Sequence, residues 1–126
     1  MVTWILWALI LAMLAWMGFN YLRIRRAAKI VDNGEFEALI RTGQLIDLRD
    51  PAEFHRKHIL GARNIPSSQL KTSLAALRKD KPVLLYENQR AQRVTNAALY
   101  LKKQGFSEIY ILSYGLDSWK GKVKTS

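Results

Sequence analysis

The chain has 126 residues, no cysteine and a formal net charge of +10 at pH 7, from 20 Lys and Arg against 10 Asp and Glu. This length suits one domain with one extra element, and the absence of cysteine excludes disulfides, Cys-based metal sites and thiol catalysis. The positive charge indicates an anionic partner, either nucleic acid or the anionic leaflet of a membrane.

The first predicted element is an apolar helix over residues 3–22, which contain no charged side chain. A helix of that length extends about 30 Å, the thickness of the hydrocarbon core of a bilayer. A cleaved signal peptide is disfavoured, because no positive side chain precedes the apolar stretch and no small-x-small site follows it. The basic flank after the helix places the rest of the chain in the cytoplasm and the N-terminus outside. We therefore predict a single-pass cell-membrane protein, with a transmembrane helix and its flank in residues 1–26 and a cytoplasmic domain in residues 27–126.

Strand and helix patterns then alternate along the cytoplasmic part. Short apolar runs predict buried strands, Asp-Pro and Ser predict helix starts, and Gly predicts helix ends. The expected strands are 27–31, 45–48, 63–66, 83–86 and 108–112, and the expected helices are 35–41, 52–57, a broken stretch over 67–78, 94–104 and a final short helix over 115–119. This alternation predicts an α/β fold in which helices flank a parallel sheet.

A polar loop between the strand over 83–86 and the following helix is the strongest candidate for a site. At the carboxyl end of a parallel strand, the N-terminus of the next helix offers free N–H groups and positive potential to an anion. The loop contains no Cys, Ser, Thr, Lys or His, so it lacks the usual nucleophiles. Its residues are Glu87, Asn88, Gln89, Arg90, Ala91, Gln92 and Arg93.

Two stretches on either side of this loop resemble the two signatures of rhodanese-like domains. The first is LIDLRDPAEF over residues 45–54, followed by HILGARNIP over residues 58–66, and the second is LSYGLDSW over residues 112–119. Tyr114 stands where the second signature usually has its first glycine. With its apolar N-terminal helix, the chain resembles the membrane-anchored single-domain rhodaneses of Gram-positive bacteria. The resemblance implies a rhodanese-like five-stranded parallel sheet flanked by helices, here preceded by the transmembrane helix.

The resemblance also implies sulfur transfer through a cysteine that begins the loop. Counting along the strand puts that position at Glu87, whereas counting back from Arg93 puts it at Asn88. Transfer requires a thiolate, which neither residue supplies. The same argument excludes the phosphatase chemistry of a related Cys-and-Arg loop. Glu87 as a nucleophile would need a second acid or base and usually a metal, so we predict that the chain is not an enzyme.

Binding remains open to the loop in two ways. Glu87 could supply the anion itself and pair with Arg90 and Arg93, or a neutral Asn88 could leave room for a small anion between these arginines. The side chains of Arg90 and Gln92 could instead be solvated at the surface, whereas the side chain of Arg93 is expected to point inward because it matches the family arginine.

Asp47 and Arg49 are expected at the same rim as the loop, and an ion pair that fixes the turn is favoured over a role in binding. His58 reads as a turn hydrogen-bonder, and His55 lacks a partner at metal-ligand spacing, so neither a metal nor a cofactor is predicted. The basic residues are spread along the chain without a nucleic-acid-binding motif, which favours the lipid bilayer as the anionic partner.

These observations predict a membrane-anchored binding or regulatory module with an unidentified protein partner. The alternative is a sulfur-relay role in which a partner protein supplies the thiol.

Overall fold

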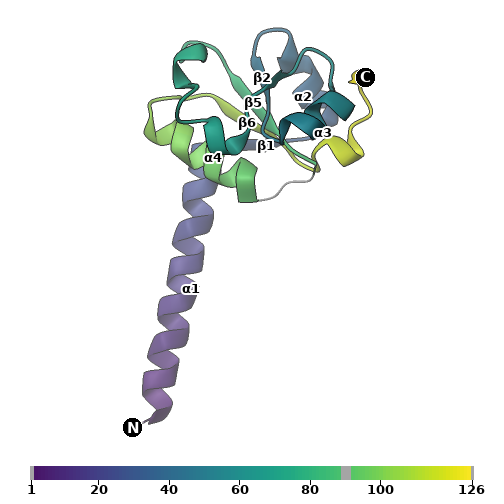
Figure 1. Cartoon of the computed structure of the whole chain (residues 1–126). Coiled ribbons are helices and arrows are strands. Elements are labelled where there is room, and N and C mark those ends of the chain that lie inside the picture. The colour runs from purple at the N-terminus through teal and green to yellow at the C-terminus, as the bar shows by residue number, and fades with distance from the viewer. Residues whose placement is uncertain (1, 89–91, 126) are drawn as a thin grey trace.

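The computed structural model describes residues 2–88 and 92–125, with the backbone alone for residues 23–27. A long helix projects from one side of an α/β domain (Figure 1). In chain order the elements are α1 Val2–Ala27, β1 Lys29–Val31, α2 Asn33–Ile40, β2 Gln44–Asp47, α3 Pro51–Arg56, β3 Lys57–Ile59, β4 Arg63–Asn64, the 3₁₀ turns η1 Ser67–Gln69 and η2 Leu74–Ala76, β5 Val83–Tyr86, α4 Gln92–Lys103, β6 Ile109–Leu112, η3 Leu116–Ser118 and β7 Val123–Thr125.

The main sheet has five parallel strands in the order β1-β6-β5-β2-β4. This confirms the predicted fold class. The central strand β5 is buried along its whole length, as its four apolar residues after Pro82 suggested. Its side chains alternate between the two faces of the sheet, as the pleat requires: Val83 and Leu85 belong to one core, and Leu84 and Tyr86 to the other.

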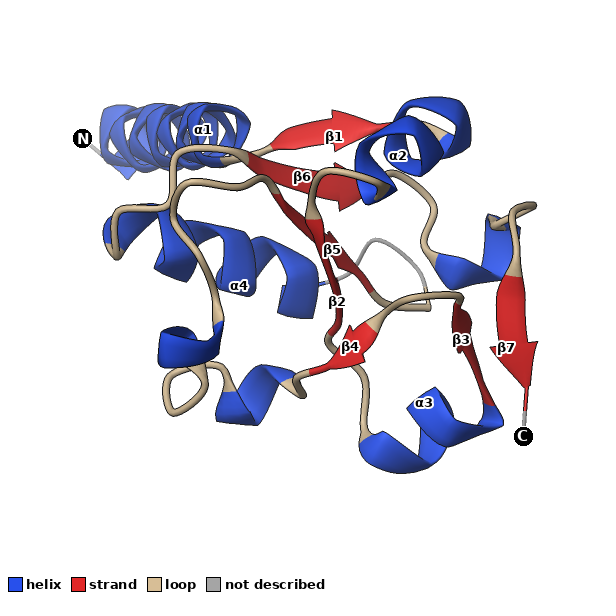
Figure 2. Ribbon diagram, turned by 90° about the horizontal axis from the view of Figure 1, so that it is seen from above, coloured by secondary structure: helices blue, strands red, loops and turns tan. Residues whose placement is uncertain are grey.

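The two cores lie on opposite faces of the sheet. One is covered by α4, which contributes Val94, Ala97, Ala98 and Leu101, together with the 67–77 segment. The other is covered by α2, η3 and β3, with Phe36 fully buried against Tyr86 and Trp119 in edge-to-face contacts. Figure 2 shows α4 and α2 on different sides of the strands. Each buried Leu or Phe contributes about 1.5–3 kcal/mol relative to an exposed one.

The predicted break near Thr72 and Ser73 is present, because two 3₁₀ turns replace one helix over 67–78. Asp32 caps α2, accepting a hydrogen bond from the Glu35 N–H at 2.9 Å. One expectation was wrong: β6 is not the last strand. The chain continues into β7, which pairs antiparallel with β3 in a separate two-stranded ribbon. Both strands have three residues and no alternating pattern, so only their tertiary pairing defines them.

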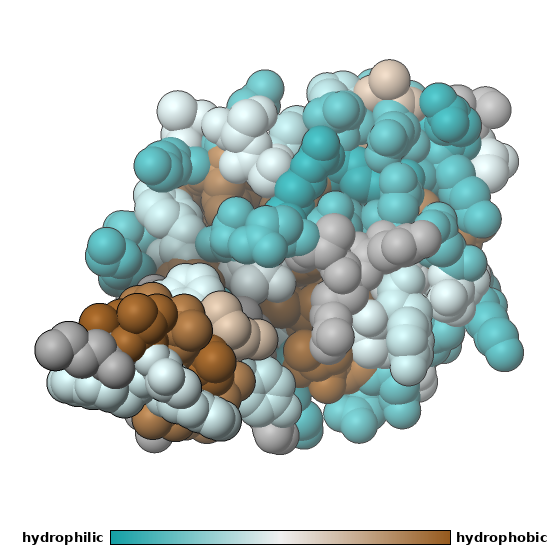
Figure 3. Space-filling model, turned by 90° about the horizontal axis from the view of Figure 1, so that it is seen from below, coloured by the Kyte–Doolittle hydropathy of each residue, from teal (hydrophilic) through white to brown (hydrophobic). Residues whose placement is uncertain are grey.

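Helix α1 continues without a linker into the domain. It ends at Ala27, the buried Ala28 joins the core, and β1 starts at Lys29. Its C-terminal end contacts α4 and β1. Residues Val2–Leu22 are long and apolar enough to cross a membrane, with a mean hydropathy of 2.0 and none of this span buried. Figure 3 shows these hydrophobic side chains beside a domain surface that is mostly hydrophilic.

Candidate functional site

The carboxyl end of β5 leads directly into the candidate loop. Tyr86 is fully buried, and its hydroxyl accepts a hydrogen bond from the Ile59 N–H at 3.1 Å. Burial raises the pKa of the Tyr86 hydroxyl far above its ordinary value, so this side chain stays neutral. The strand therefore ends on a fixed, uncharged residue, and the first charge of the loop is that of Glu87.

Glu87 occupies the N-terminus of α4 with its own carboxylate. Its side chain is only 8% exposed, and its Oε2 accepts a hydrogen bond from the Val94 N–H at 2.9 Å. Val94 is the third residue of α4, where N–H groups have no partner within the helix. A carboxylate there satisfies a free donor and meets the positive end of the helix dipole. Glu87 thus places an acidic side chain of the protein itself at this position, which is one part of the first sequence hypothesis. The other part, an ion pair with Arg93, is absent from the described residues, and Arg90 lies outside them.

Several charges act on this carboxylate. Burial raises the pKa of Glu87, the Val94 N–H and the charge of Arg93 lower it, and Glu53 and Asp47 raise it again; the balance is a pKa above the ordinary value of 4.5. Among the described residues, no ion pair joins Glu87 to a cation. The helix N-terminus, together with the more distant charge of Arg93, therefore holds the carboxylate in place of a direct salt bridge.

Arg49 connects the rim of the site, and its expected ion pair with Asp47 is present. The Nη2–Oδ2 distance is 2.8 Å, and the side chains are 6% and 0% exposed. The Arg49 guanidinium also donates to the Asn88 Oδ1 at 3.0 Å and to the Lys57 carbonyl oxygen. Burial opposes the charged form, but the hydrogen bond and charge of Asp47 outweigh it and raise the pKa of Arg49. One side chain thereby fixes β2, the loop and β3 together.

Asn88 points away from the α4 N-terminus, toward this rim. Its Nδ2 donates to the Glu53 Oε2 at 3.2 Å. Beside it lies a cavity of about 470 Å³, which we call the rim cavity. Its lining residues are Arg49, Glu53, Arg56, Lys57, Asn88, Leu116 and Asp117. Sequence reasoning named only Arg49 and Asn88 among these. Glu53, Arg56 and Lys57 follow Arg49 closely but belong to no site motif, and Leu116 and Asp117 come from a distant segment.

Gly115 brings the second signature into contact with the loop. The Leu116 and Asp117 N–H groups donate to the Glu87 and Asn88 carbonyl oxygens at 2.8 and 3.0 Å. Gly115 has a φ of +70°, and a Cβ there would lie 2.4 Å from the Asn88 carbonyl oxygen. A glycine is needed for both reasons. The neighbouring Tyr114, at the other glycine position of the signature, is 71% exposed and meets no such restriction.

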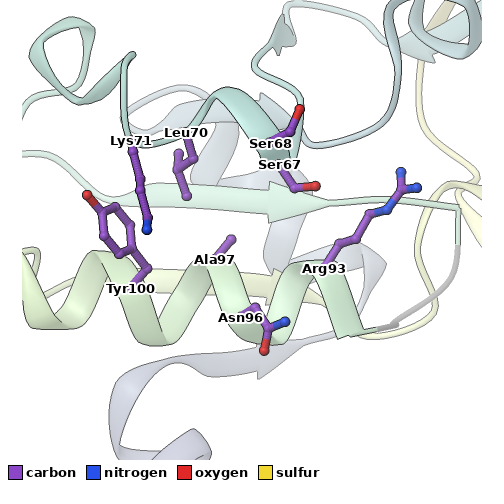
Figure 4. Close-up of a pocket in the computed structure, with 8 residues that line it drawn as sticks. All are labelled: Ser67, Ser68, Leu70, Lys71, Arg93, Asn96, Ala97 and Tyr100. Atoms are coloured by element: carbon purple, nitrogen blue, oxygen red, sulfur yellow. The ribbon is translucent and has the colours of Figure 1, made fainter.

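Arg93 and Gln92 lie in the first turn of α4. The side chain of Arg93 is exposed, which differs from the inward position we expected. It borders a different groove, with Ser67, Lys71 and Tyr100 (Figure 4). It is the next residue, Val94, that packs into the core, and Arg93 lies at the edge of the buried face of α4. Gln92 donates to the Asn96 Oδ1 at 2.9 Å on the helix surface. The predicted site residues Gln89, Arg90 and Ala91 lie outside the described residues.

The two histidines take no part in the loop. The His58 Nδ1–H donates to the Phe54 carbonyl oxygen at 2.7 Å, and its ring stacks on Phe54 with centroids 3.8 Å apart. This matches the predicted turn hydrogen bond. His55 is exposed at the end of α3. Within residues 2–88 and 92–125, no cluster of three or more His, Asp and Glu side chains could hold a metal ion.

Comparisons with known proteins agree with this architecture. The profile of the rhodanese-like domain matches residues 32–122. The protein YqhL of Bacillus subtilis is 47% identical over 113 residues, which cover 90% of this chain and 89% of YqhL. Thiosulfate sulfurtransferase GlpE of Stutzerimonas stutzeri is 37% identical over 78 residues, covering 60% of this chain and 69% of GlpE.

Among solved structures, a rhodanese-related protein from Thermoplasma volcanium superposes with a TM-score of 0.70 at 23% identity, covering 78% of this chain and 99% of that one. At this identity the likeness concerns the fold. The family profile spans the loop, both signatures and most of the sheet. The chain therefore belongs to the rhodanese-like domain family, and it is a member without any cysteine.

Proposed function

We propose that this protein is a membrane-anchored, catalytically inactive rhodanese-like domain that acts as a binding or regulatory module. The observation that carries the proposal is the position of Glu87. Its buried carboxylate accepts the Val94 N–H at the start of α4, where an anionic ligand of the loop would otherwise bind.

The absence of a thiol supports the proposal that the chain has no sulfurtransferase activity. A sulfane sulfur is carried by a thiolate, and the chain contains no thiol. A carboxylate cannot form a persulfide. Glu87 is also a poor nucleophile for another reaction, because its carboxylate is buried and hydrogen-bonded to the backbone.

A binding role is supported by what the rim retains. The rim cavity is open beside the filled helix N-terminus, and it presents Arg56 and Lys57, whose side chains are exposed. Among the residues that the structure describes, neither forms an ion pair. These cations would attract a small anion or an acidic group of a partner protein.

The anchor is supported by α1 and the sequence that ends it. An apolar span of 21 residues precedes Arg23, Arg25 and Arg26, and the positive-inside rule then places the domain in the cytoplasm. The direct passage from α1 through Ala28 into β1 suits a permanent anchor better than a removable signal.

The cysteine-free chain allows this orientation to be tested directly. Two single-cysteine variants, one with Ser-Gly-Cys inserted directly after Met1 and one with Lys103→Cys, would be treated with a membrane-impermeant maleimide in intact cells. We expect labelling of the inserted cysteine alone, with Lys103→Cys becoming reactive only after the membrane is opened. The reverse pattern would contradict the cytoplasmic placement, and release of the domain without α1 would contradict the anchor.

The alternative is a sulfur-relay role in which a partner supplies the thiol. The similarity to the thiosulfate sulfurtransferase GlpE supports this alternative. Both functions are tested by incubating full-length protein in detergent with thiosulfate and an acceptor, beside GlpE and a protein-free blank. With cyanide as acceptor we expect no turnover above the blank, and reproducible turnover would overturn the inactive assignment. Faster sulfur transfer to an added small thiol would instead favour the relay.

A further inference from the structure

A second surface lies between α2 and the β3–β7 ribbon, separate from the loop and the rim cavity. A groove of about 200 Å³ runs there, which we call the ribbon groove. Its lining residues are Glu37, Ile40, Arg41, Ile59, Leu60, Trp119 and Lys122. Leu60 is 50% exposed, whereas its neighbour Ile59 is 1% exposed and belongs to the core. The groove therefore offers an apolar floor with charged side chains at its edges.

Three lysines stand at alternate positions beside this groove. Lys120, Lys122 and Lys124 are all exposed, and in the described part of the chain none of them forms an ion pair. Gly121 is a bend, so the alternation of an extended segment applies only to the chain after it, where Lys122 and Lys124 point to the same side. Lys122 lines the ribbon groove together with Arg41 and one carboxylate, Glu37, so the groove and the flanking Lys124 carry a net positive charge.

The backbone that carries Lys122 and Lys124 is fixed to the domain. The Leu60 N–H donates to the Lys122 carbonyl oxygen at 3.0 Å, and β7 pairs with β3 so that Lys124 lies opposite His58. The Trp119 ring covers Gly121, where a Cβ would lie only 2.4 Å from the ring. The backbone that carries these lysines is therefore ordered before any partner binds, which lowers the entropic cost of binding.

The position of the groove indicates what can reach it. Figures 1 and 2 both place α2 and β7 on the side of the domain away from α1. A bilayer that contains α1 therefore does not face this surface. The half-exposed Leu60 lines this groove together with Trp119. Such an apolar surface suits an apolar side chain of a partner protein better than the phosphate backbone of a nucleic acid, because apolar anchors bind in pockets ringed by polar contacts.

We propose that the ribbon groove binds an acidic segment of a partner protein. One large apolar side chain of that segment packs on Leu60 and Trp119, and its carboxylates face Lys122 and Lys124. The surface is independent of the loop, so this inference stands whether or not Glu87 blocks catalysis.

The test uses the full-length protein in phosphatidylcholine nanodiscs, which add no net lipid charge. The probe is a short fluorescent peptide of Asp, Glu and Gly with one central Leu, and its Kd is measured by fluorescence anisotropy. We expect Leu60→Ser to weaken binding about tenfold, because it removes the buried contact with the peptide leucine. Replacing that leucine of the peptide by Ala should cause a similar loss.

Charge is tested separately. The double variant Lys122→Glu/Lys124→Glu should weaken binding several-fold, with a larger effect at low salt. Its matched control, Lys102→Glu/Lys103→Glu, makes the same charge change in the last turn of α4, and it should leave the Kd unchanged.

Three results would overturn the proposal. The first is no peptide binding, or binding that Leu60→Ser leaves unchanged. The second is an equal loss in the Lys102→Glu/Lys103→Glu control, which would mean that only net charge matters. The third is that a short RNA or a phosphatidylglycerol vesicle binds in a way that requires Lys122 and Lys124, whereas peptide binding does not require them.

Discussion

The ends of the neighbouring strands β2 and β5 each carry a buried carboxylate, and the two are neutralised differently. Asp47, at the end of β2, is paired with Arg49, which also binds Asn88 and the Lys57 carbonyl group. Glu87, after β5, has the Val94 N–H and no direct cation among the described residues. The first arrangement ties three segments together, whereas the second fills one helix N-terminus.

This difference separates the scaffold of the site from its chemistry. The β2 end holds the rim together through Arg49. The β5 end has the cradle position for an anion, but a side chain of the protein occupies it. In the function that we propose, the site keeps its framework and lacks its reactive group, and substitutions can disturb either end separately.

The largest effect is expected at the β2 end. Arg49→Ala leaves Asp47 as an unpaired buried charge, which costs about 3–5 kcal/mol in the free energy of unfolding. Urea unfolding of the full-length protein in detergent, followed by circular dichroism, measures this loss. Arg78→Ala is the matched control, because the Arg78–Asp80 pair has a 2.6 Å contact but side chains that are 61% and 64% exposed. We expect little measurable change there, and equal losses in the two variants would contradict the structural role of Arg49.

A smaller loss is expected where Gly115 meets the loop. In Gly115→Ala, a residue with a side chain must adopt the positive φ of this position, and its Cβ would collide with the Asn88 carbonyl oxygen. We expect a loss of about 1–3 kcal/mol in the free energy of unfolding. Gly61→Ala separates the two causes, since Gly61 has a φ of +91° but a Cβ there would meet no heavy atom within 4 Å. If Gly61→Ala is as costly as Gly115→Ala, the contact with the loop is not what requires the glycine.

The smallest effect concerns the charge of Glu87, and it depends on pH. Folding raises the pKa of this carboxyl, so the folded state binds the proton more tightly than the unfolded state does. The contribution of Glu87 to stability is therefore greatest at acid pH. It declines from near the ordinary pKa of 4.5 until pH exceeds the raised value.

Glu87→Gln removes this dependence while leaving an oxygen that can accept the Val94 N–H. Relative to the wild type, the variant should become more stable as pH rises from 4 toward 7, as shown by urea unfolding at each pH. A difference between the two proteins that does not change with pH would contradict the raised pKa.

Much of the sheet could be predicted from local sequence. The apolar run Val83–Tyr86 defines the central strand, and Asp50-Pro51 defines the start of α3, because these signals act over a few residues. The β3–β7 ribbon could not be predicted in this way. Its strands are far apart in the sequence, and Lys124 opposite His58 follows no hydrophobic pattern.

The site shows the same division. Asp47 and Arg49 were recognised as an ion pair because they are two residues apart at one strand end. The bond from Asn88 to Glu53 and the packing of Gly115 on the loop join distant segments, so the sequence contained no local signal for them. The exposure of Arg93 is set by how α4 packs on the sheet, which the family position of this arginine does not indicate.

The central claim is that Glu87 stands in the place of the sulfur-carrying cysteine on an otherwise retained scaffold. It is tested most directly by incubating full-length wild type, Glu87→Cys and Asn88→Cys with thiosulfate and measuring intact mass. A thiol at position 87 would lie at the N-terminus of α4, which lowers the pKa of a thiol and favours the reactive thiolate. We predict that Glu87→Cys alone takes the outer sulfur of thiosulfate with release of sulfite, so that its mass increases by one sulfur atom, which a reducing agent removes again. A persulfide on Asn88→Cys but not on Glu87→Cys would contradict the claim.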